Sequence, residues 1–227
     1  MAKKFESKLQ SLKGLKRGWK LYRLRDGKEE EIQDVGENVI LRNERFGQLT
    51  YGKSPSGPWD QWAFHENGGG GAVTIPYTII GDKIYIGMMK QARPLQADDP
   101  VWNIPRGFLQ ADDHKQTASA EFREETGVTN IEVEEMQGDF VNPNSAFFQT
   151  SGANEGVGLY AAYFPNNLLE EEEDNYVLKE KVKPLDKAEK LFGNLTFLPL
   201  SVASQVGDAF TLSAIGRLVG SHIGQEE

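Results

Sequence analysis

Cysteine is absent from this 227-residue chain, and histidine occurs only three times. These absences exclude disulfide bonds, thiolate metal sites and a cysteine nucleophile, and they leave few nitrogen ligands for a metal ion. Carboxylates, in contrast, are plentiful, with 34 Asp and Glu residues. Any metal ion that the protein binds should therefore be held by oxygen atoms.

Long apolar runs are missing as well. No stretch approaches the roughly 18 consecutive apolar residues of a membrane span, and the N-terminus lacks an apolar secretory segment. We therefore expect a soluble, cytoplasmic protein that does not bind a membrane. Basic residues are outnumbered, and the net charge of −9 opposes a general nucleic-acid surface, because phosphate backbones favour basic faces. We expect no nucleic-acid partner, and a polyphosphate substrate would have to be approached through a metal ion.

The chain contains no visible internal repeat and is predicted to form two parts. Residues 1–65 combine strand-like pieces, such as residues 39–41, with a loop rich in Gly, Pro and Ser, which indicates a small N-terminal module. The four glycines at 68–71 are not followed by the GK[ST] of a phosphate-binding loop, so they are interpreted as a flexible lead into the main sheet. Residues 66–227 are predicted to form the main domain.

Strand and helix patterns follow one another in irregular order within the main domain. The first two strands should form a hairpin, because apolar residues alternate on both sides of a Gly-Asp turn. The predicted strands are residues 73–80, 83–89, 131–136 and 158–164, and the predicted helices are residues 114–126 and 201–219. This order favours an α+β fold, in the form of an α/β/α sandwich with a mixed sheet, over a doubly wound sheet.

Three glutamates fall on one side of the helix predicted at residues 114–126. Glu121, Glu124 and Glu125 are three and four residues apart, which brings their carboxylates within a few ångströms of one another. An isolated pattern of this kind is usually a set of surface glutamates. However, no Lys or Arg stands four residues before them to relieve the repulsion. A hard divalent cation would neutralise the cluster, and Mg²⁺ needs few protein oxygens because substrate phosphates complete its coordination.

The surroundings of these glutamates resemble the Nudix box. The family pattern is G, five residues, E, seven residues, R-E-U-x-E-E-x-G-U, where U is a bulky apolar residue, and residues 107–128 read GFLQADDHKQTASAEFREETGV. The matching positions are Gly107, Glu121, Phe122, Glu124, Glu125, Gly127 and Val128. Two positions depart from the pattern: Ala120 stands where the box has arginine, and the spacing after Gly107 is one residue short.

Other segments resemble the branch of this family that hydrolyses ADP-ribose and nucleotide sugars. Residues 91–94 read QARP, residues 104–107 read IPRG, and residues 208–214 read DAFTLSA, in the order that this branch has. Asn103 stands where the branch usually has glutamate. The resemblance covers roughly residues 68–220. It implies hydrolysis of a nucleoside diphosphate linked to another moiety, ADP-ribose or a nucleotide sugar, to a nucleoside monophosphate and a sugar phosphate.

The resemblance also implies a metal site and an assembly. Glu121 and Glu125 would bind Mg²⁺, for which Mn²⁺ can substitute, and Glu124 would assist or hold a metal-bound water. The backbone carbonyl of Gly107 would complete one site. Members of this branch are homodimers whose N-terminal modules help to build the partner's substrate pocket, and we expect the same assembly for this chain.

The catalytic base implied by the resemblance is a glutamate in a loop beyond the box. One candidate is Glu155, which lies in a glycine-rich loop before the strand predicted at 158–164. The other is the acidic run 170–174, expected to be a solvated loop that folds over the pocket, with Glu172 or Glu173 as the base. A metal-bound water without a carboxylate base is the third alternative.

Two arginines are candidates for substrate binding. Arg93 and Arg106 both precede the box in the sequence, and each is expected to contact phosphate or to form a structural ion pair. The absence of the box arginine at Ala120 supports a rival function. In that alternative the chain is a catalytically weakened Nudix domain that senses a nucleotide sugar or binds a partner.

Overall fold

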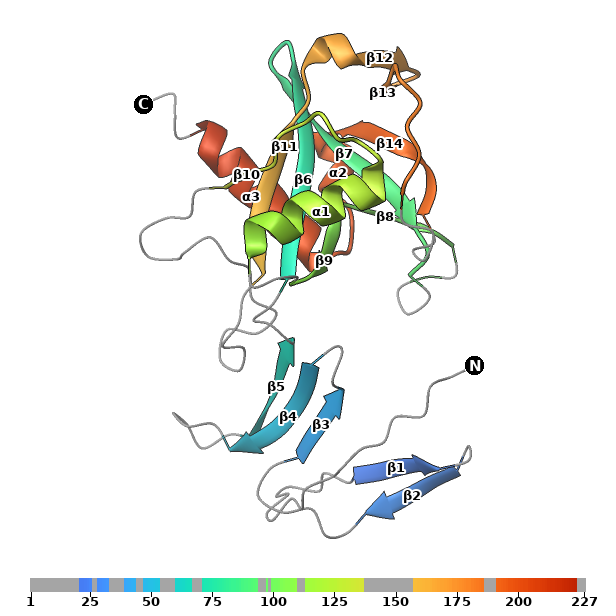
Figure 1. The fold of residues 1–227 in the computed structure, drawn as a ribbon, viewed down its shortest axis with the longest axis vertical. Helices are drawn as coiled ribbons and strands as arrows, with labels where there is room; N and C mark the ends of the chain where they lie inside the picture. Colours follow the sequence, from blue (N-terminus) through green and yellow to red (C-terminus); the bar gives the residue numbers. More distant parts are fainter. Residues whose placement is uncertain are drawn as a thin grey trace. The chain divides into compact units, whose positions relative to one another are not determined.

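The structure, a computed structural model, consists of two compact units (Figure 1). One unit comprises residues 1–69 and 149–155, and the other comprises residues 70–148 and 156–227. In the first unit the backbone of five strands is described. In the second unit the structure describes residues 71–93, 97, 99–109, 113–136, 157–185 and 191–223.

The N-terminal unit contains two small antiparallel sheets. Strands β1 (Leu21–Arg25) and β2 (Lys28–Ile32) form a hairpin. Strands β3 (Val39–Asn43), β4 (Gly47–Lys53) and β5 (Asp60–Glu66) form a sheet in the order β3-β4-β5. The strand expected at residues 39–41 is confirmed as part of β3.

A mixed nine-stranded sheet forms the centre of the larger unit, with the order β10-β11-β6-β7-β14-β13-β12. Short strands β8 and β9 pair with β7 and β6. Only the β11–β6 pairing is parallel among those described. The strands are β6 (Gly71–Ile80), β7 (Lys83–Gln91), β8 (Val101–Asn103), β9 (Arg106–Phe108), β10 (Glu134–Glu135), β11 (Gly158–Tyr163), β12 (Leu169–Glu172), β13 (Asn175–Leu178) and β14 (Leu191–Pro199).

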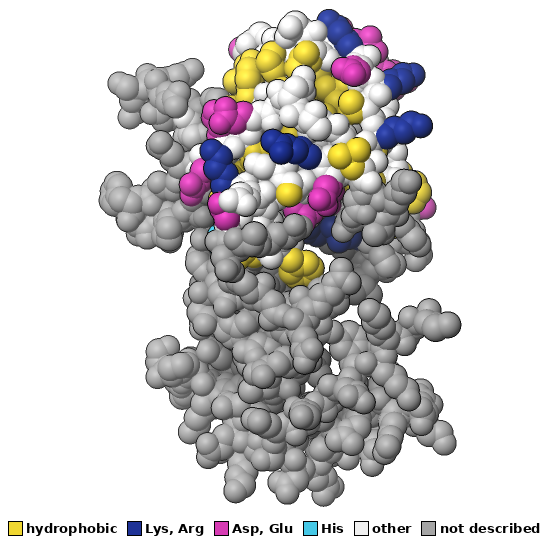
Figure 2. Space-filling model, viewed as in Figure 1, with side chains coloured by type: hydrophobic (Ala, Val, Ile, Leu, Met, Phe, Trp, Pro, Cys, Tyr) yellow, Lys and Arg dark blue, Asp and Glu magenta, His cyan; other side chains and the backbone are white. Residues whose placement is uncertain are grey.

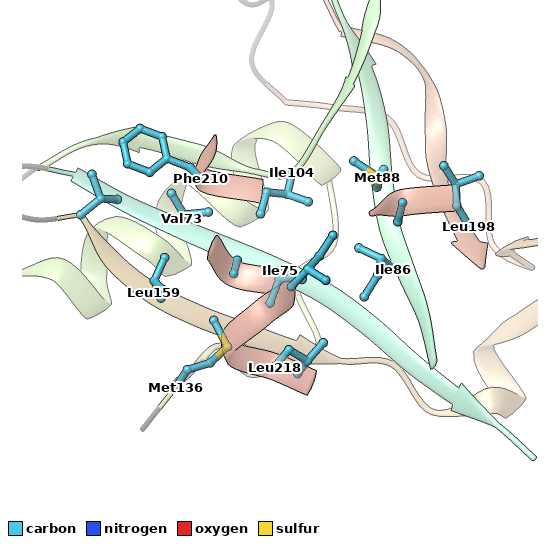
Figure 3. Close-up of a cluster of buried hydrophobic side chains, with 14 residues drawn as sticks. Val73, Ile75, Ile86, Met88, Ile104, Met136, Leu159, Leu198, Phe210 and Leu218 are labelled. Carbon is cyan, nitrogen blue, oxygen red and sulfur yellow. The ribbon is translucent and has the colours of Figure 1, made fainter. Parts of the chain in front are cut away.

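The side chains of β6 point alternately to the two faces of the sheet, and the core is accordingly divided into two layers. Val73 and Ile75 pack on the face that carries α3 (Ala209–Ile223), together with Phe210 and Leu218 of that helix (Figure 3). Ala72 packs on the opposite face, which α1 (His114–Thr126) covers. Because successive strand residues point to opposite faces, one strand supplies both cores. The predicted α+β class, an α/β/α sandwich around a mixed sheet, is confirmed.

Helix α1 begins and ends where its sequence indicates. The side chain of Asp113 accepts a hydrogen bond from the Gln116 backbone N–H at 3.0 Å, which caps the N-terminus. Gly127 ends the helix with a φ of 75°, and a side chain there would meet the backbone carbonyl of Lys183 at 2.2 Å. The predicted helix 114–126 and the hairpin of β6 and β7 are thus confirmed.

Three other sequence expectations differ from the structure. The helix expected at 201–219 is two helices, α2 (Leu200–Ala203) and α3, because Asp208 caps a new helix by accepting a hydrogen bond from Thr211 N at 2.9 Å. The strand expected at 131–136 is reduced to β10, which pairs with β11 over two residues. The acidic run 170–174 is solvent-exposed as expected, but it is a hairpin rather than an irregular loop: residues 170–172 belong to β12 and pair with β13, and residues 173–174 form the turn. A short 3₁₀ helix, Asn166–Leu168, comes just before β12. Among the described residues, no helix has the length and apolarity that crossing a membrane requires.

Candidate functional site

Gly107 and Glu121 come together where β9 lies beneath α1. Gly107 pairs with Ala72 across β9 and β6. A β-carbon at position 107 would stand 2.0 Å from the carboxyl carbon of Glu121 and 2.1 Å from its Oε1. These distances are far below van der Waals contact, so the Glu121 carboxylate occupies the space that the missing side chain leaves. Glycine at this position allows the carboxylate to approach the β9 backbone.

Glu125 approaches the same short strand from one turn further along the helix. Its side chain is only 2% exposed, and its Oε2 accepts a hydrogen bond from the Arg106 backbone N–H at 3.3 Å. Residues four apart on a helix share a face, and the buried Phe122 lies on the same side. The structure therefore brings Gly107, Glu121 and Glu125 together.

Glu124, the third glutamate of the pattern, is exposed. Its backbone carbonyl accepts a hydrogen bond from Leu185 N at 2.7 Å, which ties the end of α1 to the segment after β13. Within the described ranges of the chain, no group of three or more His, Asp and Glu side chains is arranged to hold a metal ion. Glu121 and Glu125 face β9, whereas the side chain of Glu124 is exposed to solvent on α1.

The side chain of Arg106 forms a structural ion pair. Its Nη1 donates to Asp208 Oδ1 at 2.7 Å, and its guanidinium carbon lies 5.7 Å from the centre of the Phe210 ring. The other Asp208 oxygen accepts hydrogen bonds from the Thr211 backbone N–H and hydroxyl, at 2.9 and 2.8 Å. This ion pair joins β9 to the start of α3. Of the two roles expected for Arg106, phosphate contact or a structural ion pair, the structure shows the ion pair.

Asp208 is ionised in this arrangement. Burial raises the pKa of Asp208, but the Arg106 guanidinium and the hydrogen bonds from Thr211 and Arg106 outweigh burial and hold the pKa below its ordinary value. In the sequence, residue 208 is recognisable only as part of a helix-start pattern. An aspartate just before a helix indicates an N-cap, so the bond to Thr211 can be expected from the sequence. The bond to Arg106 cannot, because Arg106 stands 102 residues away.

Arg93, Glu172 and Glu173 are the other sequence-predicted residues that the structure describes. Arg93 is half-buried just beyond β7, and its carbonyl accepts from Ala97 N at 3.1 Å. Glu172 and Glu173 are exposed at the turn between β12 and β13. Figure 1 shows this hairpin at the top of the unit and β9 at the bottom, so the structure does not bring these glutamates to Glu121 and Glu125. Glu155 lies outside the described residues.

Comparison with known proteins gives matches at the level of structure. No protein-family model matches the sequence, and no curated protein matches it. Ap4A hydrolase of C. elegans in a binary complex is similar at 18% identity and a TM-score of 0.41, over 68% of this chain and 97% of that one. The NUDIX domain of Shewanella oneidensis NrtR, complexed with ADP ribose, is similar at 14% identity and a TM-score of 0.43, over 66% and 86%. An ADP compounds hydrolase is similar at 12% identity and a TM-score of 0.49, over 86% and 98%. The solved structures similar to this chain therefore include a NUDIX domain and two hydrolases.

Proposed function

We propose that the chain is a Nudix hydrolase that uses Mg²⁺ to cleave the diphosphate of a nucleoside diphosphate derivative, ADP-ribose or a nucleotide sugar. The observation that carries this proposal is the convergence of Glu121 and Glu125 on the β9 backbone at Gly107. The reaction adds water across one phosphoric anhydride bond. A new P–O bond forms as the old one breaks, and the products are a nucleoside monophosphate and a sugar phosphate.

The donor set fits a hard cation. Two carboxylates on one helical face repel each other, and Glu125 is almost fully buried, where an uncompensated charge is costly. A divalent cation offsets both costs. Mg²⁺ in particular is usually bound by one or two carboxylates, with water and substrate phosphates as its other ligands, so this pair suffices. The Gly107 carbonyl is a further candidate ligand, and the exposed Glu124 would assist from the solvent side. Bound there, the cation would stabilise negative charge on the diphosphate.

The protein's own groups would prepare this site. The Arg106 backbone N–H donates a hydrogen bond to Glu125 Oε2, which fixes this carboxylate against β9. The ion pair between Arg106 and Asp208 anchors the β9 residue that makes this bond. Arg93, the remaining phosphate-binding candidate, would contact the substrate through its guanidinium group.

Glu155 is the base that we propose to take a proton from the attacking water, because it precedes by three residues in the sequence the strand β11, whose start lies near Gly107. Gly158, Ala72 and Gly107 form one row across β11, β6 and β9. Two strand spacings, about 10 Å, therefore separate the start of β11 from Gly107. Glu172 and Glu173 belong to the opposite end of the unit.

The proposed partners are a small molecule and a second copy of the chain. On the face shown in Figure 2, acidic and basic side chains of the described residues are interspersed, and the net charge is −9, which supports a small substrate over nucleic acid. The two sheets described in the N-terminal unit have two and three strands, and such small sheets suit a role in dimer formation. Sedimentation should show a dimer at micromolar concentration. A fully active monomer would exclude this assembly.

A substrate panel tests the proposed reaction. The full chain is incubated with ADP-ribose and nucleotide sugars, with Mg²⁺ or with EDTA, and the monophosphates formed are measured by phosphate release after phosphatase treatment. We expect phosphate release only when both enzyme and Mg²⁺ are present. The rival function, a nucleotide-sugar sensor, is favoured by Ala120 in place of the box arginine. Tight binding of a panel member without turnover would establish that function instead.

A further inference from the structure

Asn103, the last residue of β8, carries a buried amide that the proposed mechanism does not use. Its side chain is 3% exposed. Within the described part of the chain, neither Oδ1 nor Nδ2 has a hydrogen-bond partner. A buried amide that makes no hydrogen bond costs its full desolvation, whereas an apolar side chain of similar shape would be nearly neutral there. A polar group outside the protein is therefore the natural partner for this amide.

The register places this amide on the α1 face of the sheet. Trp102 packs with the core layer of α3 and pairs with Lys90, whose amine lies 5.1 Å from the Trp102 ring centre. Asn103 pairs with Met89, which belongs to the core layer of α1. Successive strand residues alternate between faces, and directly paired residues share one. The Asn103 side chain therefore points into the layer beneath α1.

The same layer holds the carboxylates of the proposed metal site. Glu125 projects into it from α1, together with the buried Phe122, which packs in one cluster with Met89. Three residues after Asn103, the Arg106 backbone N–H binds Glu125. The amide and the buried carboxylate thus border one strand segment and one helix face.

We propose that the Asn103 carboxamide oxygen is a further donor of the cation site formed by Glu121 and Glu125. This inference rests on the proposed function. Amide oxygens are hard, neutral ligands of the kind that such cations accept. With two carboxylates and one amide, the site has a charge of about −2, which one divalent cation balances. An acid at position 103 would add a third negative charge to the site.

Direct titration of the full-length protein with Mn²⁺, followed by electron paramagnetic resonance, tests this role without relying on activity. Asn103→Leu should weaken Mn²⁺ binding by about tenfold or more, because it removes the oxygen donor. Asn103→Asp keeps an oxygen and adds charge, so it should bind Mn²⁺ at least as tightly as the unchanged protein. Thr78→Val is the control, since it removes a buried hydroxyl that bonds to Phe164 O at 2.7 Å outside the site. This control should leave Mn²⁺ binding unchanged.

Two results would overturn the inference. One is an Asn103→Leu protein that binds Mn²⁺ within about twofold of the unchanged protein, and the other is a loss of about tenfold or more in Asn103→Asp. Glu125→Gln separates these outcomes from failure of the proposed function. If Glu125→Gln loses Mn²⁺ binding and Asn103→Leu does not, only the role of Asn103 is wrong. If Glu125→Gln binds Mn²⁺ normally, the cation site itself is wrong.

Discussion

The larger unit has two acidic clusters that look similar in sequence and differ in structure. The glutamates of α1 meet the backbone of β9, and one of them, Glu125, is buried. The acidic run ending at Asp174 lies in the hairpin of β12 and β13, where every carboxylate is exposed. Water and salt screen the repulsion between exposed carboxylates, whereas a buried carboxylate needs a compensating partner. Burial against a strand therefore distinguishes a candidate metal site from a solvated acidic surface.

The largest expected effect comes from neutralising the buried cluster. The double variant Glu121→Gln/Glu125→Gln should lower kcat/KM by at least about 10³-fold, or roughly 4 kcal/mol, because it removes both anionic ligands. The Tm should not fall, because the substitution removes the repulsion between the two carboxylates. The matched control, Glu170→Gln/Glu171→Gln, removes two exposed charges from the hairpin and should keep full activity in the same steady-state assay. Equal losses in both double variants would show that the clusters do not differ in function.

The second effect tests whether Glu155 or the hairpin of β12 and β13 supplies the base. Glu155→Gln should lower kcat by about 10²–10⁴-fold while Mn²⁺ affinity is nearly unchanged, as expected for a general base. Glu172→Gln and Glu173→Gln should retain most of their activity. A large loss of kcat in either hairpin variant would contradict the assignment of Glu155. If all three variants keep more than about a tenth of kcat, no loop glutamate acts as the base.

The third effect concerns the space that Gly107 leaves for Glu121. Gly107→Ala should displace this carboxylate and lower activity by about 10–100-fold, the range found when the support of a metal ligand is lost. The clash is with the end of a flexible side chain, so the Tm should fall by less than about 4 °C. Gly216→Ala is the matched control. Its new methyl group meets nothing within 4 Å, so this substitution in α3 should stabilise the protein by about 0.5–1 kcal/mol and leave activity unchanged. Unchanged activity in Gly107→Ala would show that the close approach has no role.

Local signals predicted α1 and the β6–β7 hairpin, because caps, turns and periodicity depend on residues close in sequence. Asp113 and Gly127 mark the two ends of α1 directly. The helix at the C-terminal end was predicted too long, because its apolar pattern continues through the turn before Asp208. The hairpin of the acidic run was missed for another reason. Its pairing with the sheet depends on Tyr176 and Val177 meeting β14, a contact between distant segments.

Part of the candidate site was also accessible from the sequence. Spacing predicted that the three glutamates share one side of α1, and Glu121 and Glu125 do meet β9. Helix periodicity relative to Phe122 indicates which glutamate is buried, since residues three apart share a face and Glu125 follows Phe122 at that spacing. The sequence carries no local signal for the partner of Arg106, because Asp208 stands just before α3, 102 residues away.

The smallest expected effect concerns this Arg106–Asp208 link. Asp208→Asn should destabilise the protein by about 1 kcal/mol at pH 7, because it removes the charge of the carboxylate that accepts the Arg106 hydrogen bond while an amide oxygen remains. The pKa of Asp208 is lowered in the folded state. The stability that this charge contributes is therefore complete above the unfolded-state pKa, about 3.9, and is lost as the pH falls through the folded-state pKa. Thermal unfolding should show that the variant has a lower free energy of unfolding than the unchanged protein, by a constant amount between pH 7 and pH 5 and by less below about pH 4.

A double-mutant cycle with Arg106→Met supplies the control, since the coupling energy between the two substitutions should show the same pH dependence. A deficit that persists unchanged at low pH would mean that helix capping through Thr211, rather than the ion pair, is what Asp208 contributes.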